Sequence, residues 1–105
     1  MKLIAVTACP TGIAHTYMAA AKLETAAKTL GHDIKVETQG AIGIENQLSS
    51  TDIAGATVAI FAVDIAVEAE ERFAKLPTVR VPVQEAIKDP EGIFRKAEAV
   101  LSRKG

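Results

Sequence analysis

The fold is decided near the N-terminus, by residues 3–16, which read LIAVTACPTGIAHT. The apolar run from Leu3 to Val6 predicts a short buried strand. A helical pattern then runs from Ile13 to Leu30, and Gly31 follows it, where a glycine commonly ends a helix. This stretch therefore predicts a strand, a short loop and a long helix, which together form the opening unit of an α/β fold.

The rest of the chain continues the same alternation. Further strands are expected at residues 34–37, 57–63 and 78–81, and further helices at residues 45–48, 66–75 and 90–102. Asp89 and Pro90 suit the N-cap and the first position of the last helix. This order predicts one Rossmann-like α/β domain over residues 1–105. Its sheet would have four parallel strands in the order 2-1-3-4, with helices on both faces.

The composition narrows the function classes. The 105 residues carry a net charge of −1, and the basic residues are scattered, so we expect no nucleic-acid partner. No apolar run approaches the roughly 18 residues of a membrane span, and the first residues do not resemble a signal peptide. We therefore expect a cytoplasmic chain without direct membrane insertion. Its single cysteine, Cys9, suits a reducing compartment.

Cys9 occupies the loop between the first strand and the first helix. Ligands of parallel α/β sheets bind at the carboxyl ends of the strands, so this loop is the first place to look for a site. The partial positive charge and unpaired N–H groups at a helix start favour a thiolate and also bind anions. Gly12 would allow close backbone approach, and Thr11, His15 and Thr16 would offer polar groups.

Several other interpretations of the loop remain open. Cysteine is often simply a core residue, and His15 could be an ordinary exposed helix residue. Low-molecular-weight tyrosine phosphatases also place five residues between their cysteine and an Arg-Ser/Thr pair, where this chain has His15 and Thr16. Histidine cannot replace the bidentate phosphate binding of arginine, and Asp89 is explained as a helix cap. A phosphomonoesterase is therefore the alternative to a protein that holds a phosphoryl group without handing it to water.

The loop also lies within a longer recognisable stretch. Residues 6–20, VTACPTGIAHTYMAA, resemble the signature of the fructose-specific enzyme IIB of the bacterial sugar phosphotransferase system. Residues 35–40, the pair Arg72-Phe73, and the Asp52-Ile53 and Asp64 regions also follow the pattern of that family, so that the resemblance covers roughly residues 1–100. Ala41 and Ala74 depart from it, where Ser and Gly are expected.

The resemblance implies a specific role. A IIB domain accepts a phosphoryl group from a phosphohistidine of its IIA domain onto a cysteine, here Cys9. It passes the group to a sugar, typically fructose, at the membrane IIC domain. The implied phosphate-binding residues are Pro10, Thr11, Gly12, Ile13, Ala14, His15 and Thr16. We expect no metal ion and no cofactor. The sugar is inherited from the family, and a IIB-like module of a transcriptional regulator is a third hypothesis.

Overall fold

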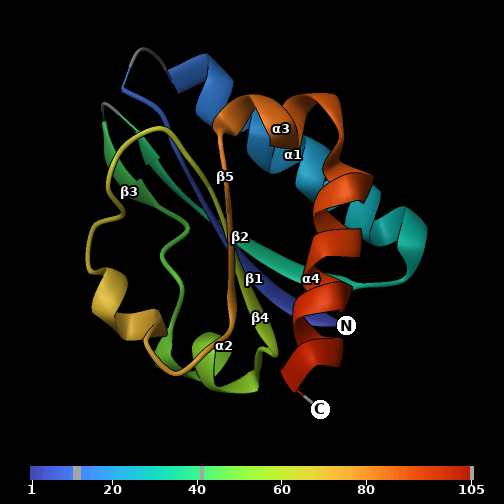
Figure 1. Cartoon of the computed structure of the whole chain (residues 1–105). Coiled ribbons are helices and arrows are strands. Elements are labelled where there is room, and N and C mark those ends of the chain that lie inside the picture. The colour runs from blue at the N-terminus through green and yellow to red at the C-terminus, as the bar shows by residue number, and fades with distance from the viewer. Residues whose placement is uncertain (11–12, 41, 105) are drawn as a thin grey trace.

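A computed structural model describes residues 1–10, 13–40 and 42–104. The strands are β1 (Lys2–Ala8), β2 (Asp33–Gly40), β3 (Gly43–Glu45), β4 (Val58–Val63) and β5 (Thr78–Val81). The helices are α1 (Ile13–Leu30), α2 (Ser50–Gly55), the 3₁₀ helix η1 (Glu70–Phe73), α3 (Val83–Lys88) and α4 (Pro90–Lys104). Figure 1 shows α1, α3 and α4 on one side of the twisted sheet and α2 with η1 on the other. The class and the helices on both faces are confirmed.

The sheet has five strands in the order β3-β2-β1-β4-β5. The β1 strand pairs in parallel with β2 and β4, and β4 pairs in parallel with β5, as the predicted order requires. The difference is β3, which pairs antiparallel with β2. Gly43 makes this hairpin possible, because its φ of +105° is one that side chains strongly disfavour. A three-residue strand beside a glycine leaves too little periodicity to predict.

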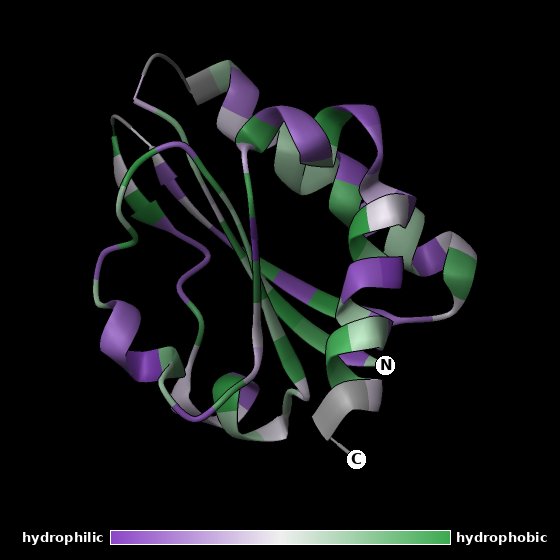
Figure 2. Ribbon diagram, in the orientation of Figure 1, coloured by the Kyte–Doolittle hydropathy of each residue, from purple (hydrophilic) through white to green (hydrophobic). Residues whose placement is uncertain are grey.

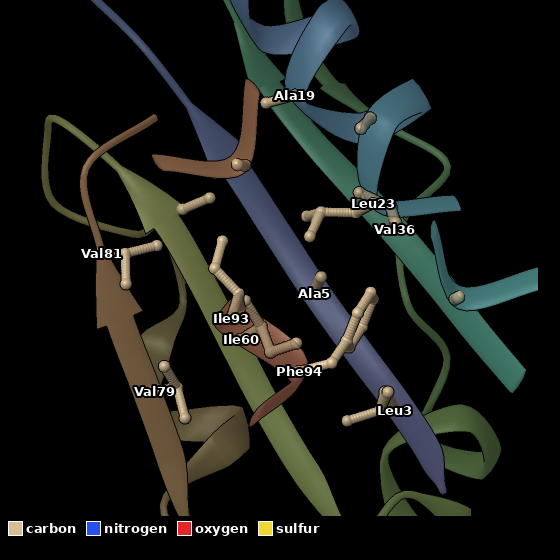
Figure 3. Packing of buried hydrophobic residues seen from close by; sticks show 14 of the residues in the cluster. Leu3, Ala5, Ala19, Leu23, Val36, Ile60, Val79, Val81, Ile93 and Phe94 are labelled. Atoms are coloured by element: carbon tan, nitrogen blue, oxygen red, sulfur yellow. The ribbon is translucent and has the colours of Figure 1, made fainter. Parts of the chain in front are cut away.

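The larger core lies between the sheet and helices α1, α3 and α4. Alternate residues of β1 and β4, such as Leu3, Ala5 and Ile60, point toward this side and meet Leu23 and Phe94 (Figure 3). Hydrophobic residues dominate the central strands, whereas η1 is hydrophilic (Figure 2). The chain has no tryptophan, and its small core residues let α1 lie close to the sheet.

The opposite face carries a second, smaller core. Ile4, Val6 and Phe61 from the strands pack there against Phe73 of η1, whose ring lies edge-on to Phe61 with centroids 5.4 Å apart. Because the two cores use alternate residues of the same strands, β1 and β4 are buried on both faces, as a central parallel sheet requires.

Two of the predicted helices are wrong. Glu45 ends β3, and the nearby helix is instead α2, which begins after the N-cap Ser49 in a capping box with Asp52. Residues 66–75 form only the short η1, because polar side chains take up the backbone groups of Glu68 and Ala69, and Ala69 adopts a left-handed φ of +55°. The short helix α3 was not predicted at all.

The last helix begins as predicted. The backbone N–H of Gly92 donates to Oδ1 of Asp89 at 3.0 Å, so Asp89 caps α4. Within the described ranges, no helix is both long enough and apolar enough to cross a membrane.

Candidate functional site

Cys9 lies immediately beyond the carboxyl end of the central strand β1. It is 5% exposed and belongs to the core on the α1 side of the sheet. The carbonyl of the preceding residue, Ala8, accepts a hydrogen bond from the backbone N–H of Asp64 at 2.9 Å, which joins the ends of β1 and β4. In the sheet, β2 lies on one side of β1, and β4 lies on the other side. Cys9 therefore sits at the point where the strand order switches.

The first turn of α1 is fixed against the strand that carries the cysteine. The hydroxyl of Thr7 donates to the carbonyl oxygen of Thr16 at 3.1 Å, and both residues are buried. Since α1 begins at Ile13, its N-terminal backbone N–H groups lie a few residues from Cys9 along the chain. The strand-loop-helix arrangement predicted around Cys9 is thus present.

The other predicted site residues have different surroundings. Pro10, Ala14 and His15 are exposed. Thr16, in the first turn of α1, is buried. Thr11 and Gly12 lie outside the described residues, so their predicted phosphate contacts stay predictions. The structure thus brings Cys9, Thr7 and Thr16 to one side of the sheet and leaves His15 on the outer surface of α1.

Exposed apolar side chains surround this end of the sheet. Tyr17 and Met18 lie on α1, Ile42 lies in the β2–β3 hairpin, and Ile65 follows β4. In Figure 1, these segments meet around the carboxyl ends of the parallel strands. The hydroxyl of Tyr17 donates to the carboxylate of Glu45, which links α1 to β3. An apolar surface of this kind suits contact with another protein.

A buried ion pair lies on the opposite face of the same strands. Glu37 of β2 is completely buried, and both of its carboxylate oxygens accept from the guanidinium of Arg72, at 2.9 and 3.0 Å. The backbone N–H of Leu48 and the amide of Gln39 donate to the same carboxylate at 2.9 and 2.7 Å. This group of residues, Glu37, Gln39 and Arg72, is called the Glu37 network below.

Glu37 and Arg72 of the Glu37 network are both ionised at neutral pH. Burial acts to raise the pKa of Glu37, but the hydrogen bonds from Arg72, Leu48 and Gln39 outweigh it, and the pKa lies below its ordinary value. The hydrogen bond to Glu37 correspondingly raises the pKa of Arg72. A bidentate pair with further donors compensates for much of the cost of burying both charges.

The network also holds the segment that follows β4. The side chain of Gln39 accepts from the N–H of Glu68 at 2.8 Å and donates to its carbonyl at 3.3 Å. The guanidinium of Arg72 bonds to the carbonyls of Glu68 and Ala69. Sequence reasoning missed this role, although Glu37 and Arg72 both belong to segments that carry the family resemblance. An ionisable residue inside a predicted strand was the available signal.

Among the residues that the structure describes, no cluster of three or more His, Cys, Asp or Glu side chains could hold a metal ion. The arrangement at Cys9 instead combines a sulfur atom, a helix N-terminus and an apolar surround. These are groups suited to binding an anion and meeting a protein partner.

Comparison with known proteins places the chain in a family. The family model for "PTS system, Lactose/Cellobiose specific IIB subunit" matches residues 4–96. The chain is 53% identical over 102 residues to the PTS system fructose-like EIIB component 2 of Escherichia coli K12, covering 97% of this chain and 96% of that protein.

Solved structures agree with this placement. The enzyme IIB subunit of the PTS system from E. coli K12 is 46% identical, with a TM-score of 0.88 over 98% of this chain and 95% of that one. A predicted fructose-specific IIB from E. coli is 40% identical, with a TM-score of 0.90 over 95% of this chain and 88% of that one. The chain and its fold thus belong to a phosphotransferase-system component. More particularly, the chain belongs to the IIB family, and two of the relatives named above carry fructose-like or fructose-specific names.

Proposed function

We propose that this chain carries a phosphoryl group on Cys9 between a phosphorylated IIA domain and a sugar at a membrane IIC domain. The observation that carries the proposal is the position of Cys9, at the strand-order switch and directly before the N-terminus of α1. Unpaired N–H groups and the helix dipole favour a bound phosphoryl group there. The fructose-like names of the relatives favour fructose as the sugar.

The surface around Cys9 supports exchange with other proteins. The donor and acceptor must each bring a reacting group to a cysteine that is only 5% exposed. The apolar side chains of Tyr17, Met18, Ile42 and Ile65 offer a surface on which each could dock in turn. Through its IIC partner the chain would act at the cytoplasmic face of the membrane.

The residues of the loop would share the work. Backbone N–H groups of residues 11–16 would surround the phosphoryl oxygens, and the hydroxyl of Thr16 and the ring of His15 would supply further donors. The buried contact between Thr7 and Thr16 would hold the helix start at a fixed distance from the sulfur. Such preorganised donors stabilise the charge that spreads over a phosphoryl group during transfer.

The phosphomonoesterase alternative rests on the spacing of Cys9, His15 and Thr16 alone. The arginine that such an enzyme needs is replaced by His15, and Arg72 is bound to Glu37. Asp89 is committed to capping α4. The adjoining Pro90 and Glu91 line a shallow depression with residues 22–29, in the second half of α1 and several turns from its N-terminus. A general acid at Asp89 is therefore badly placed to serve Cys9.

The test is phosphorylation by a reconstituted relay. The chain is incubated with phosphoenolpyruvate, the general phosphocarrier proteins and a IIA domain, and the product is analysed by mass spectrometry. We expect a single phosphoryl group on the sulfur of Cys9 that is absent from Cys9→Ala. Label that persists in Cys9→Ala would overturn the proposal. Steady hydrolysis of an aryl phosphate, lost in Cys9→Ala, would instead establish the phosphomonoesterase.

A further inference from the structure

Thr38 of β2 carries a buried hydroxyl that is left without a hydrogen bond. The residue is 2% exposed, and among the described residues its Oγ1 is the buried side-chain polar atom that has no partner. Burying a hydroxyl without a partner is unfavourable, so such a group calls for an explanation. Its neighbours on β2, Glu37 and Gln39, are by contrast fully engaged in hydrogen bonds.

The register of the sheet places Thr38 beside the cysteine. Thr7 of β1 is paired with Thr38. This pair lies two residues beyond the pair Ala5 and Val36, which belongs to the core on the α1 side. Because side chains alternate along a strand, Thr7 and Thr38 also point to the α1 side. Cys9, two residues beyond Thr7, belongs to the same core. Thr38 is therefore the diagonal cross-strand neighbour of Cys9.

The nearby hydroxyl of Thr7 is already committed, because it donates to the carbonyl of Thr16. Thr38 is thus a buried, unpartnered hydrogen-bond donor on the strand next to the one that leads to Cys9, and it is shielded from water. A neutral thiol is a weak acceptor, whereas a thiolate is a charged acceptor and makes a much stronger hydrogen bond.

We propose that the Thr38 hydroxyl donates to Sγ of Cys9 when that sulfur is a thiolate. The inference rests on the proposed function, in which the thiolate is both nucleophile and leaving group. In the accepting step the S–P bond forms as the N–P bond of a phosphohistidine breaks, and the electron pair stays on the imidazole nitrogen, which takes a proton from solvent. In the donating step a sugar hydroxyl attacks phosphorus and loses its proton to solvent, and the S–P electron pair returns to Sγ.

The first test needs no partner protein. Alkylation of Cys9 by iodoacetamide is followed from pH 6 to pH 10 in the wild type, Thr38→Val and Thr38→Ser. We expect T38V to react about tenfold more slowly at pH 7, the loss of one hydrogen bond to a charged group. At the high-pH plateau, where every thiol is ionised, T38V should match the wild type within about twofold. T38S keeps the hydroxyl and should follow the wild type.

The remaining charges near the site are the same in all three proteins. Titratable groups near this end of the sheet include His15 and Tyr17 on α1, Glu45 on β3, Asp64 and Glu68 after β4, and Glu85 on α3. A difference between T38V and T38S therefore reports the hydroxyl. Since valine replaces threonine with nearly the same shape and removes an unpartnered group, T38V should melt at the same temperature as the wild type or higher.

The outcomes separate this inference from the proposed function. An unchanged alkylation profile in T38V, an equal slowing at pH 7 and at the plateau, or a clear fall in melting temperature would each overturn the role of Thr38. In the reconstituted relay, the wild type tests the proposed function. If the wild type is phosphorylated on Cys9, T38V should accept and release the group several-fold more slowly, and equal rates would refute the inference alone.

Discussion

The buried polar side chains on the two faces of β2 differ in how completely they are hydrogen-bonded. On the face toward α2 and η1, Glu37 and Gln39 are saturated with hydrogen bonds and tie the segment after β4 to the sheet. On the face toward α1, Thr38 has no partner and lies on the strand next to β1, which ends one residue before Cys9. The first face holds loops in place, and the second carries the hydroxyl for which we propose a role at Cys9. If that proposal holds, stability and function are divided between alternate residues of one strand.

The largest effect on stability should come from breaking the Glu37 network. Arg72→Met leaves the carboxylate of Glu37 buried without its partner, which should lower the free energy of unfolding by about 3–5 kcal/mol. Urea denaturation would measure it. The matched control is Arg80→Met, because the pair of Arg80 with Glu70 is half exposed and should change stability by less than about 1 kcal/mol. Equal losses in the two variants would refute the distinction.

Removing both charges separates pairing from packing. The double variant Glu37→Gln with Arg72→Met leaves no buried charge and should regain part of the stability lost in R72M alone. If the double variant is less stable than R72M, the packing of these side chains matters more than the charge balance.

A smaller effect should appear as a pH dependence. The pKa of Glu37 is lowered from 4.5 in the folded chain, so the unfolded chain takes up the proton first as pH falls. The stability from Glu37 is complete above that ordinary value and is lost as pH drops through the lower folded value. Glu37→Gln cannot titrate there, so its unfolding free energy should fall less steeply below about pH 4.5 than that of the wild type.

Thermal melts from pH 3 to pH 7 would compare the two proteins. At pH 7 the wild type should be the more stable, and the gap should narrow with acid. Glu70→Gln is the control, because the exposed carboxylate of Glu70 pairs with Arg80 at the surface and its loss should leave the slope almost unchanged. A constant gap at every pH would show that the Glu37 carboxylate keeps the same proton affinity in both states.

The smallest effect on stability is expected at His15. The residue is exposed on α1, so His15→Ala should change the free energy of unfolding by no more than about 0.5 kcal/mol. Under the proposed function it should still slow phosphoryl transfer several-fold, because a donor beside the phosphoryl group is lost. Lys22→Ala, also exposed on α1, is the control and should leave transfer unchanged. Equal transfer rates in H15A and wild type would remove His15 from the site.

The sequence predicts well what depends on local pattern. The parallel strands, the long helix α1 and the capped start of α4 follow from apolar runs and from residues such as Gly31 and Asp89. The position of Cys9 followed from the same strand-loop-helix pattern. Each of these features is specified by residues that lie close together in the sequence.

What the sequence could not predict depends on contacts between distant segments. The helix expected at residues 66–75 is largely absent because Gln39, some thirty residues away, binds the backbone of Glu68. The partnerless state of Thr38 depends on the strand register and on what every neighbour binds. A three-residue strand such as β3 exists only because β2 provides an edge for it.

The anchoring of the segment after β4 has a consequence for binding kinetics. Asp64 is held to Ala8 through its N–H and to the N–H of Val83 through its carboxylate, and Glu68 is held to Gln39. Ile65 therefore projects from a short stretch that is fastened at both ends. A partner that docks on Ile65 meets a surface with little conformational entropy left to lose. Under the proposed function, such preorganisation would suit a carrier that engages two different partners briefly in every cycle.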